Sequence, residues 1–314
     1  MTDYGRPVRF GLNVDPNVDL LREARRLAAA ADTAGLDLLG VQDHPYQPGH
    51  LDAWMLLGDL AYRTERISLF TDVSDLQLRP PTMLAKAAAS LSVQTNGRIQ
   101  LGVGGGAFPD AIAAMGATPR QGAAMVRYTE ESLQILRQAL TGGEVRLRGT
   151  GLGEGRQGES RQGDGGEHRV VGYRAGPVPP TPVEIWLGSR GPRMLALTGR
   201  ASDGWVCPLN IYVAPEDVPR RHQVIDDAAQ AAGRDPAQVR RIYNVLGTIG
   251  AGAAGPGLSG TAAHWADTMT DWALRLGFDT FVFWPTGDHE RQATAFAAEV
   301  VPEVRRRVKD ARGG

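Results

Sequence analysis

Short apolar runs alternate with longer amphipathic stretches along nearly the whole chain, and this alternation restricts the fold more than any other feature. Each run has the length of a buried strand, and a pattern with helical periodicity follows each one. Eight such strand–helix pairs are present, which is the number that a closed parallel barrel requires. The sequence therefore predicts an α/β fold, a (β/α)8 TIM barrel, with an open doubly wound sheet as the alternative.

The expected elements can be placed from the apolar runs and from the helix-ending glycines, such as Gly35 and Gly277. The strands are expected at residues 9–14, 38–42, 67–72, 99–103, 183–187, 204–207, 243–249 and 280–284. The helices are expected at residues 19–34, 53–64, 81–95, 123–140, 192–201, 215–232, 261–276 and 289–306. A barrel of this length forms a single domain over residues 1–314.

Composition and charge exclude several classes of protein. The net charge is −1, so nothing in the charge balance points to nucleic acid or to an anionic membrane. No apolar run is long enough to span a bilayer, and the polar start of the chain lacks a signal-peptide core, so we expect a cytoplasmic protein. The single cysteine, Cys207, rules out a disulfide framework and is expected to be a buried structural thiol.

Residues 142–182 interrupt the alternation with a dense run of glycines and charges. Almost no apolar residue precedes Val170 there, so this segment cannot bury enough surface to order strongly. We expect a flexible insertion between the fourth helix and the fifth strand. Two interpretations stay open, a disordered excursion and a mobile lid over the site.

The loop after the second strand carries the best candidates for acid–base chemistry. Asp43, His44, Tyr46 and His50 fall within eight residues, and two prolines stiffen the loop. Histidine is the side chain that most readily transfers protons near neutral pH. The alternative is that Asp43 caps a turn and His44 packs against a neighbour. No further histidine or cysteine cluster has ligand spacing, so a metal site is not expected.

The loops after the third and fourth strands offer weaker signals. Asp72 and Asp75 lie at the end of the third strand, where they either face a cavity or lie in a solvated loop. Gly104, Gly105 and Gly106 follow the fourth strand and allow a ligand to approach the backbone closely. The glycine run lacks the lysine of a Walker motif and the order of a dinucleotide fingerprint.

The segment after the fifth strand has the composition of an anion site. Gly188, Ser189, Arg190 and Gly191 precede Pro192, which suits the first turn of a helix. Free N–H groups at a helix start, with a hydroxyl and arginines nearby, bind phosphate. The alternative is an ordinary helix start with solvated arginines. After the eighth strand, Trp284 either stacks on a ring system or fills the core.

Two consecutive segments carry a resemblance to a known family. Residues 78–91 read LRPPTMLAKAAASL, and residues 96–106 read NGRIQLGVGGG. Together with Gly191-Pro192 before a helix and ASDGW at residues 201–205, they resemble the bacterial-luciferase-like oxidoreductases. Members of that family bind either flavin mononucleotide (FMN) or the deazaflavin coenzyme F420. The order of the segments agrees over almost the whole chain outside the glycine-rich insertion.

The resemblance implies a cofactor ring at the carboxyl ends of the strands. It also implies a non-prolyl cis peptide at the end of the third strand, placed by alignment at Asp72-Val73, against which the ring lies. The family usually has glycine, serine or alanine where this chain has Asp72. The Asp43-His44 pair is similar to a pair in the deazaflavin-dependent sugar-phosphate dehydrogenases, in which the aspartate contacts the cofactor and the histidine transfers a proton.

Two departures bear on the substrate. Those dehydrogenases carry tryptophan where this chain has Gly49, and a catalytic glutamate where it has Ala107. A sugar phosphate is therefore not expected as the substrate, whereas the cofactor class still is.

Three functions remain open at this stage. The leading hypothesis is hydride transfer between coenzyme F420 and a small organic substrate, with His44 as the proton donor or acceptor. The second is an FMN-dependent monooxygenase that uses oxygen and receives reduced flavin from a partner reductase. The third is a non-catalytic member that binds a cofactor. The resemblance also implies a homodimer, and the apolar run at residues 54–57 suits such an interface or a contact within the barrel.

Overall fold

The computed structural model describes residues 3–147 and 167–313. These residues divide into two compact units. The first lies within residues 1–74, 98–103 and 184–314, and the second within 75–97 and 104–183. The expectation of a single domain stays a prediction.

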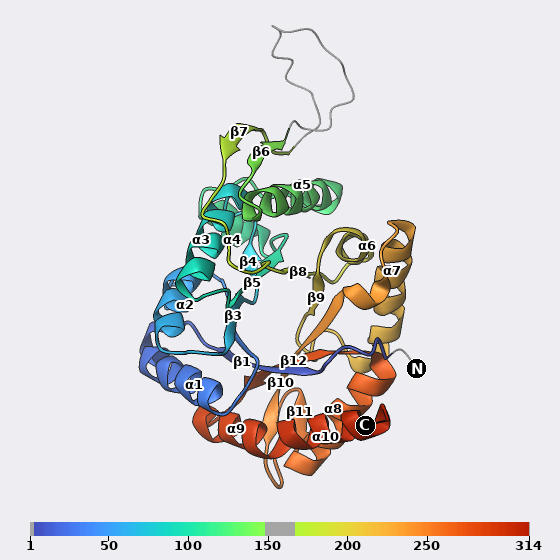
Figure 1. Ribbon diagram of the computed structural model, residues 1–314. Coiled ribbons are helices and arrows are strands. Elements are labelled where there is room, and N and C mark those ends of the chain that lie inside the picture. Colours follow the sequence, from blue (N-terminus) through green and yellow to red (C-terminus); the bar gives the residue numbers. More distant parts are fainter. Residues whose placement is uncertain (1–2, 148–166, 314) are drawn as a thin grey trace, which may run out of the picture. The chain divides into compact units, whose positions relative to one another are not determined.

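The first unit contains a closed barrel of eight parallel strands, which confirms the predicted fold class (Figure 1). Around the barrel each strand pairs with the next, and the last pairs with the first. In this order the strands are β1 (Arg9–Val14), β2 (Leu38–Val41), β3 (Ser68–Thr71), β5 (Ile99–Gly104), β8 (Ile185–Gly188), β9 (Gly204–Cys207), β10 (Arg240–Ile249) and β12 (Thr280–Pro285). A further short strand, β11 (Leu258–Gly260), pairs with β10.

Helices connect these strands at the positions that the sequence predicted. They are α1 (Leu21–Thr33), α2 (Ala53–Tyr62), α6 (Pro192–Ala201), α7 (Val218–Ala231), α8 (Ala262–Asp271), α9 (His289–Ala295) and α10 (Val301–Ala311). Local chemistry sets several of their ends. The Asp52 carboxylate accepts hydrogen bonds from the backbone N–H groups of Trp54 and Met55 at the start of α2. Figure 1 shows α6 and α7 side by side.

Shorter helical pieces extend or link these helices. The 3₁₀ turns are η1 (Val18–Leu20), η2 (Pro215–Asp217) and η3 (Pro236–Gln238). Two stretches of π-helix, η4 (Trp272–Leu276) and η5 (Phe296–Val300), follow α8 and α9. The single helix expected at residues 289–306 is therefore three consecutive segments, α9, η5 and α10.

The middle of the barrel is filled by one layer of large apolar side chains. Its members are Leu38, Phe70, Trp186, Val206, Ile242 and Val282. Side chains alternate along a strand, so residues two positions further on also point into the barrel. Those residues are Asp72 directly after β3, Asn244 on β10 and Trp284 on β12. The apolar layer thus lies beneath a polar layer at the carboxyl ends of the strands.

Strand β10 is longer than predicted because two arginines begin it. The apolar pattern suggested a start at Tyr243, but Arg240 and Arg241 are already in the strand and are buried. Arg240 pairs with Asp279 at 3.1 Å, and Arg241 pairs with Asp226 at 2.5 Å. Buried charges are tolerated when they are paired in this way, and a reading of apolar runs cannot anticipate it.

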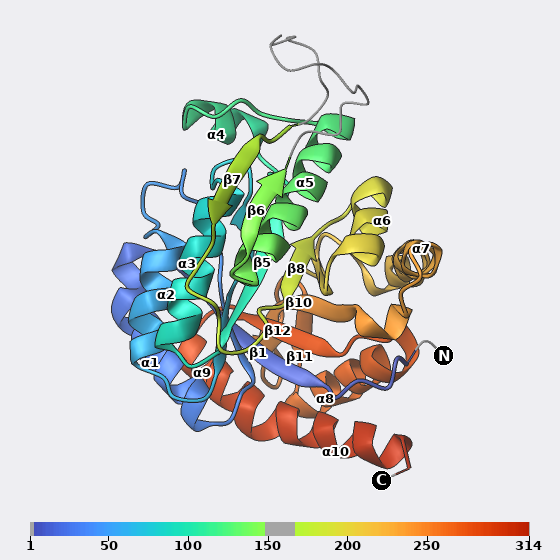
Figure 2. The same ribbon diagram turned by 45° about the horizontal axis from the view of Figure 1, so that its top comes forward.

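The second unit contains α3 (Pro81–Gln94), α4 (Pro109–Ala114) and α5 (Gly122–Leu140). After α5, β6 (Glu144–Leu147) and β7 (Val170–Arg174) form an antiparallel pair beside that helix (Figure 2). The sequence predicted no strand within residues 142–182, and the structure places one near each end of that segment. The side chains of Val145 and Leu147 alternate with exposed ones and are buried, which orders β6. Residues 148–166 of the insertion lie outside the described residues.

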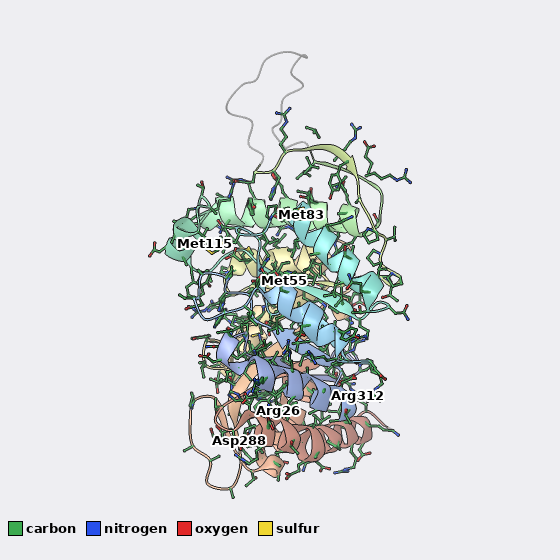
Figure 3. The ribbon with its side chains drawn as sticks, turned by 90° about the vertical axis from the view of Figure 1, so that its left-hand side faces the viewer. Arg26, Met55, Met83, Met115, Asp288 and Arg312 are labelled. Atoms are coloured by element: carbon green, nitrogen blue, oxygen red, sulfur yellow. The ribbon has the colours of Figure 1, made fainter. Side chains whose placement is uncertain are left out.

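Most of the apolar run at residues 54–57 faces inward. Trp54, Leu56 and Leu57 are buried, whereas Met55 is 73% exposed on α2 (Figure 3). Packing within the first unit therefore explains why three of these four residues are apolar. The homodimer stays a prediction. The described helices include none that is long and apolar enough to cross a membrane.

Candidate functional site

The polar layer of the barrel is held together by hydrogen bonds across its interior. The Asn244 amide nitrogen donates to Asp72 Oδ1 at 3.1 Å, and the Trp284 indole nitrogen donates to Asn244 Oδ1 at 3.1 Å. Asp72 follows β3 directly, while its two partners lie on β10 and β12. This hydrogen-bonded series therefore joins three strands at the mouth of the barrel. It places Trp284 in contact with the core layer and with a polar partner at once.

Asp72 is the most unusual ionisable group of this layer. Its side chain is buried, and its second oxygen, Oδ2, has no hydrogen-bond partner among the described residues. Burial raises the pKa of Asp72 to about 7, although the hydrogen bond from Asn244 opposes the shift. At neutral pH this carboxyl group therefore exchanges readily between its protonated and ionised forms.

The peptide bond Asp72-Val73 is cis, as the resemblance implied. Two glycines give Val73 its space. A Cβ at Gly188 would lie 3.0 Å from Val73 Cγ2, and a Cβ at Gly102 would lie 2.0 Å from the Thr71 carbonyl oxygen. Strands β5 and β8 therefore need glycine at these positions for the chain to pass through residues 71–73 as it does.

The loop after β2 brings three aromatic rings together beside this layer. The His44 ring stacks on Tyr46 with centroids 5.5 Å apart and on His50 with centroids 6.3 Å apart. Burial lowers the pKa of His44, and His50 lowers it further, while buried Asp43 acts in the opposite direction. The Asp72 backbone N–H donates to the Val41 carbonyl oxygen at 2.8 Å, so the loop starts next to Asp72.

Two asparagines of this layer were missed by the sequence analysis. Asn13 is buried near the end of β1, and its Oδ1 has no partner among the described residues. Asn244 lies in the middle of β10 between apolar neighbours. The available signal was a lone amide at an inward position of a buried strand. Such a group is costly without a partner, so it marks a place where polar atoms meet.

The segment before α6 keeps only part of its expected anion-binding chemistry. The Thr198 hydroxyl donates to the Met194 carbonyl oxygen, so the Ser189 hydroxyl is the donor in their 2.9 Å hydrogen bond. Ser189 therefore has no hydroxyl proton left for a phosphate. Arg190 is exposed, and Gly191 caps α6 without a side-chain hydrogen bond. The helix start and Arg190 thus remain as candidate phosphate contacts.

The glycine run at residues 104–106 belongs to the second unit, and side chains of that unit already occupy its surroundings. The Gln77 amide nitrogen donates to the Gly105 carbonyl oxygen at 2.6 Å. At Gly106 the backbone is left-handed, with φ of 89°, and a Cβ would lie 2.7 Å from Ile112 Cδ1. Packing within the unit is sufficient reason for glycine at 106, and a role of these glycines in cofactor binding stays a prediction.

No cluster of metal-ligating side chains occurs in residues 3–147 or 167–313. Cys207 is buried, as expected, and burial raises the pKa of its thiol. The chemistry of the site therefore rests on carboxyl, imidazole, amide and indole groups.

Comparison with known proteins places the chain in a family. Residues 7–254 match the family model of the luciferase-like monooxygenases. An F420-dependent glucose-6-phosphate dehydrogenase from Gordonia bronchialis is 31% identical over 197 residues, which cover 59% of this chain and 52% of that protein. A 5,10-methylenetetrahydromethanopterin reductase from Methanolobus tindarius is 30% identical over 230 residues, covering 73% and 62%. The chain thus spans about half to three fifths of the length of these relatives.

Solved structures with the same fold include a coenzyme F420 dependent reductase and a monooxygenase. The coenzyme F420 dependent tetrahydromethanopterin reductase of Methanopyrus kandleri superposes with a TM-score of 0.75 at 18% identity, covering 95% of this chain and all of that one. A monooxygenase from Streptomyces bottropensis superposes with a TM-score of 0.76 at 20% identity, covering 94% and 99%. At these identities the likeness concerns the fold alone.

Proposed function

The chain belongs to the luciferase-like monooxygenase family, and from this premise we propose that it is an oxidoreductase that transfers a hydride between coenzyme F420 and a small organic substrate. The observation that carries the proposal is the Asp43-His44 pair after β2, beside the polar layer of the barrel. The pair matches the cofactor-contacting aspartate and proton-transferring histidine of the deazaflavin-dependent dehydrogenases that this chain resembles. A relative named as an F420-dependent dehydrogenase is 31% identical.

The polar layer fits a flat, polar ring. Asn13 Oδ1 is a buried acceptor without a partner among the described residues. A bound ring with N–H groups would satisfy such an atom, which otherwise costs free energy. Val73 and Trp284 would offer it apolar surface. When bound, the deazaflavin supplies the hydride chemistry, while the protein orients the reactants and moves protons.

His44 is the residue that we assign to proton transfer with the substrate. Because burial lowers its pKa, the imidazole is neutral at neutral pH and is able to accept a proton. Asp43 is buried next to it and would contact the cofactor. Arg190 and the N–H groups at the start of α6 would bind the phosphate of the cofactor. The departures at Gly49 and Ala107 argue against a sugar phosphate as the substrate.

The cofactor is tested by titrating the purified protein with coenzyme F420 and, separately, with FMN, and following their fluorescence. We expect saturable binding of F420 at lower concentration than FMN. Tighter binding of FMN would instead favour a monooxygenase that is supplied with reduced flavin by a partner reductase. Binding of neither cofactor would overturn the proposed function.

The role of His44 is tested by His44→Ala, with His264→Ala as the control. His264 is an exposed histidine on α8. We expect His44→Ala to lower turnover by about 100-fold or more, the usual contribution of a general acid or base, with little loss of F420 affinity. His264→Ala should match the wild type in both measurements. Unchanged turnover in His44→Ala would remove this residue from the mechanism.

A further inference from the structure

We propose that Asp72 is a second proton-transfer residue of this site, a carboxylic acid that delivers its proton to the substrate. The inference rests on the proposed function and deepens it, because the family usually carries a residue without a carboxyl group at this position.

The Trp284–Asn244–Asp72 series determines which oxygen holds the proton. An indole N–H is a donor only, so the Asn244 amide must present its oxygen to Trp284. The amide nitrogen of Asn244 then necessarily faces Asp72 and donates to Oδ1. Oδ1 is thereby occupied as an acceptor, and the proton of a neutral Asp72 resides on Oδ2. That atom is buried and has no partner among the described residues.

Among residues 3–147 and 167–313, no cation lies close enough to Asp72 to hold it in its ionised form. The side chains that the surrounding strands contribute near the barrel mouth are Asn13 on β1, Asp43 and His44 after β2, Asn244 on β10 and Trp284 on β12. The titratable ones are a second carboxyl and an imidazole. Burial lowers the pKa of the imidazole, so it is uncharged at neutral pH.

Burial shifts the pKa values of Asp72 and His44 in opposite directions. The pKa of Asp72 rises to about 7, whereas the pKa of His44 falls from its ordinary value of 6.5. Near neutral pH, Asp72 therefore has a proton to give while His44 has a lone pair to accept one. A pair of groups whose pKa values are moved apart in this way is a common arrangement for an acid and a base in one site.

In the reducing direction the step is the protonation of a carbonyl oxygen. Asp72 Oδ2–H gives its proton to the oxygen as the carbonyl carbon receives a hydride, with its two electrons, from a reduced deazaflavin. The C=O double bond becomes a C–O single bond, and an alcohol forms. Asp72 is left as a carboxylate and takes up one proton from water before the next turnover. The deazaflavin leaves the step in its oxidised form, and its ring N–H proton returns to water, which balances the proton that Asp72 takes up.

The first test measures the proton directly, without a cofactor. Infrared difference spectra between acid and alkaline pH should show a carboxylic-acid C=O band that titrates near pH 7. The band should be absent in Asp72→Asn, which is uncharged and still able to accept the Asn244 hydrogen bond. It should remain in Asp37→Asn, which lacks a half-buried carboxylate at the amino end of β2. A wild-type protein without the band would overturn the proposal.

The second test uses the F420-loaded protein and a ketone that the wild type reduces. We expect Asp72→Asn to bind F420 as the wild type does but to reduce the ketone about 100-fold more slowly, a typical loss for a missing general acid. The wild-type rate should decline above pH 7, where Asp72 loses its proton, whereas the rate of Asp72→Asn should not. Undiminished turnover would mean that Asp72 only ties β3 to β10. Failure of the wild type to bind F420 would overturn the proposed function, while the infrared result still decides whether Asp72 holds the proton.

Discussion

Arg98, the arginine of the NGR signature, acts as a structural clamp in the first unit. Its guanidinium donates to the carbonyl oxygens of Ala61, Thr64 and Ile67 and to the Thr64 hydroxyl, at 2.9 to 3.0 Å. The first two carbonyls lie at the end of α2, where carbonyl groups lack helical partners and the helix dipole is negative. The third precedes β3, so one side chain joins the end of α2 to the start of the strand that leads to Asp72.

We expect Arg98→Met to lower the free energy of unfolding by about 2–4 kcal/mol, because several partly buried carbonyl groups lose a charged donor. Arg98→Lys should recover only part of this, since an ammonium group cannot reproduce the planar fork. Equilibrium denaturation by urea measures both. Arg22→Met, a substitution at an exposed arginine of α1, is the control and should change stability by less than about 0.5 kcal/mol. A similarly small effect at Arg98 would refute the clamp.

Individual residues also show which features of the site could be predicted from the sequence and which could not. The resemblance correctly located the cis Asp72-Val73 peptide, and apolar patterning correctly buried Cys207. Asn13 and Asn244 were not predicted as site residues, because an isolated amide in an apolar run belongs to no motif. The partner of Asn244 also follows a strand that is distant in sequence. Ser189 was expected to face a ligand, yet its hydroxyl proton is used inside the protein. Such partners depend on register between strands, which composition does not report.

At the scale of elements, the strand–helix order was predictable and the exceptions have local causes. Helices and strands with one buried face repeat their apolar residues, and those repeats marked nearly every element of the barrel. Strands β6 and β7 lay in a segment whose glycines suggested disorder, and only their packing beside α5 reveals them. The start of β10 was missed because its arginines are neutralised by acids elsewhere in the chain.

At the contact between α6 and α7, replacing glycine by alanine would favour the helix but would create a steric clash. Gly199 lies in α6, where a Cβ would be 2.1 Å from the Ile225 carbonyl oxygen of α7. Gly58 lies in α2, where a Cβ would meet nothing within 4 Å. In a helix, alanine is favoured over glycine by about 0.5–1 kcal/mol. We therefore expect Gly58→Ala to stabilise the protein by about that amount and to raise its Tm.

Gly199→Ala should do the reverse, because α6 and α7 must separate to admit the methyl group. We expect a loss of about 1–3 kcal/mol, the usual cost of overpacking. Thermal unfolding of both variants beside the wild type makes the comparison. If both substitutions stabilise the protein equally, the close approach of the two helices does not exist in solution.

At the scale of the whole molecule, the barrel and its family could be predicted, because both follow from features repeated along the chain. The division into two compact units could not. The residues of each unit are interleaved in sequence, with residues 98–103 of the first lying between two parts of the second. Boundaries of this kind arise from contacts between distant segments and leave no linker for a sequence reading to find.

His222, a buried histidine of α7, contacts segments of the first unit that are distant in sequence. Its ring packs against Tyr4, Trp205 and Phe278, with centroids 6.0, 5.3 and 5.2 Å away. These partners come from the N-terminal segment, from β9 and from the residues before β12. Burial lowers the pKa of His222 well below 6.5, and nearby Arg241 lowers it further. The folded protein therefore keeps this imidazole neutral, whereas the unfolded chain protonates it below pH 6.5.

The sign of the resulting pH dependence follows from linkage. Above pH 6.5 both states are neutral at His222, and its titration contributes nothing. As the pH falls below 6.5 the unfolded state binds the additional proton, so the wild type loses about 1.4 kcal/mol per pH unit from this group. The buried Asp72 acts oppositely, since its raised pKa makes stability fall as the pH rises from about 4 to about 7. Asp72 is present in both proteins of a His222 comparison, so its contribution cancels.

We therefore expect His222→Leu, whatever its stability at pH 8, to lose less stability than the wild type between pH 6.5 and pH 5. The difference between the two slopes should approach 1.4 kcal/mol per pH unit, because leucine has no proton to bind. Urea denaturation at several pH values measures both slopes. His264→Gln, which removes an exposed imidazole on α8, should keep the slope of the wild type. Parallel curves for His222→Leu and the wild type would mean that water reaches His222 and that the aromatic contacts around it are open in solution.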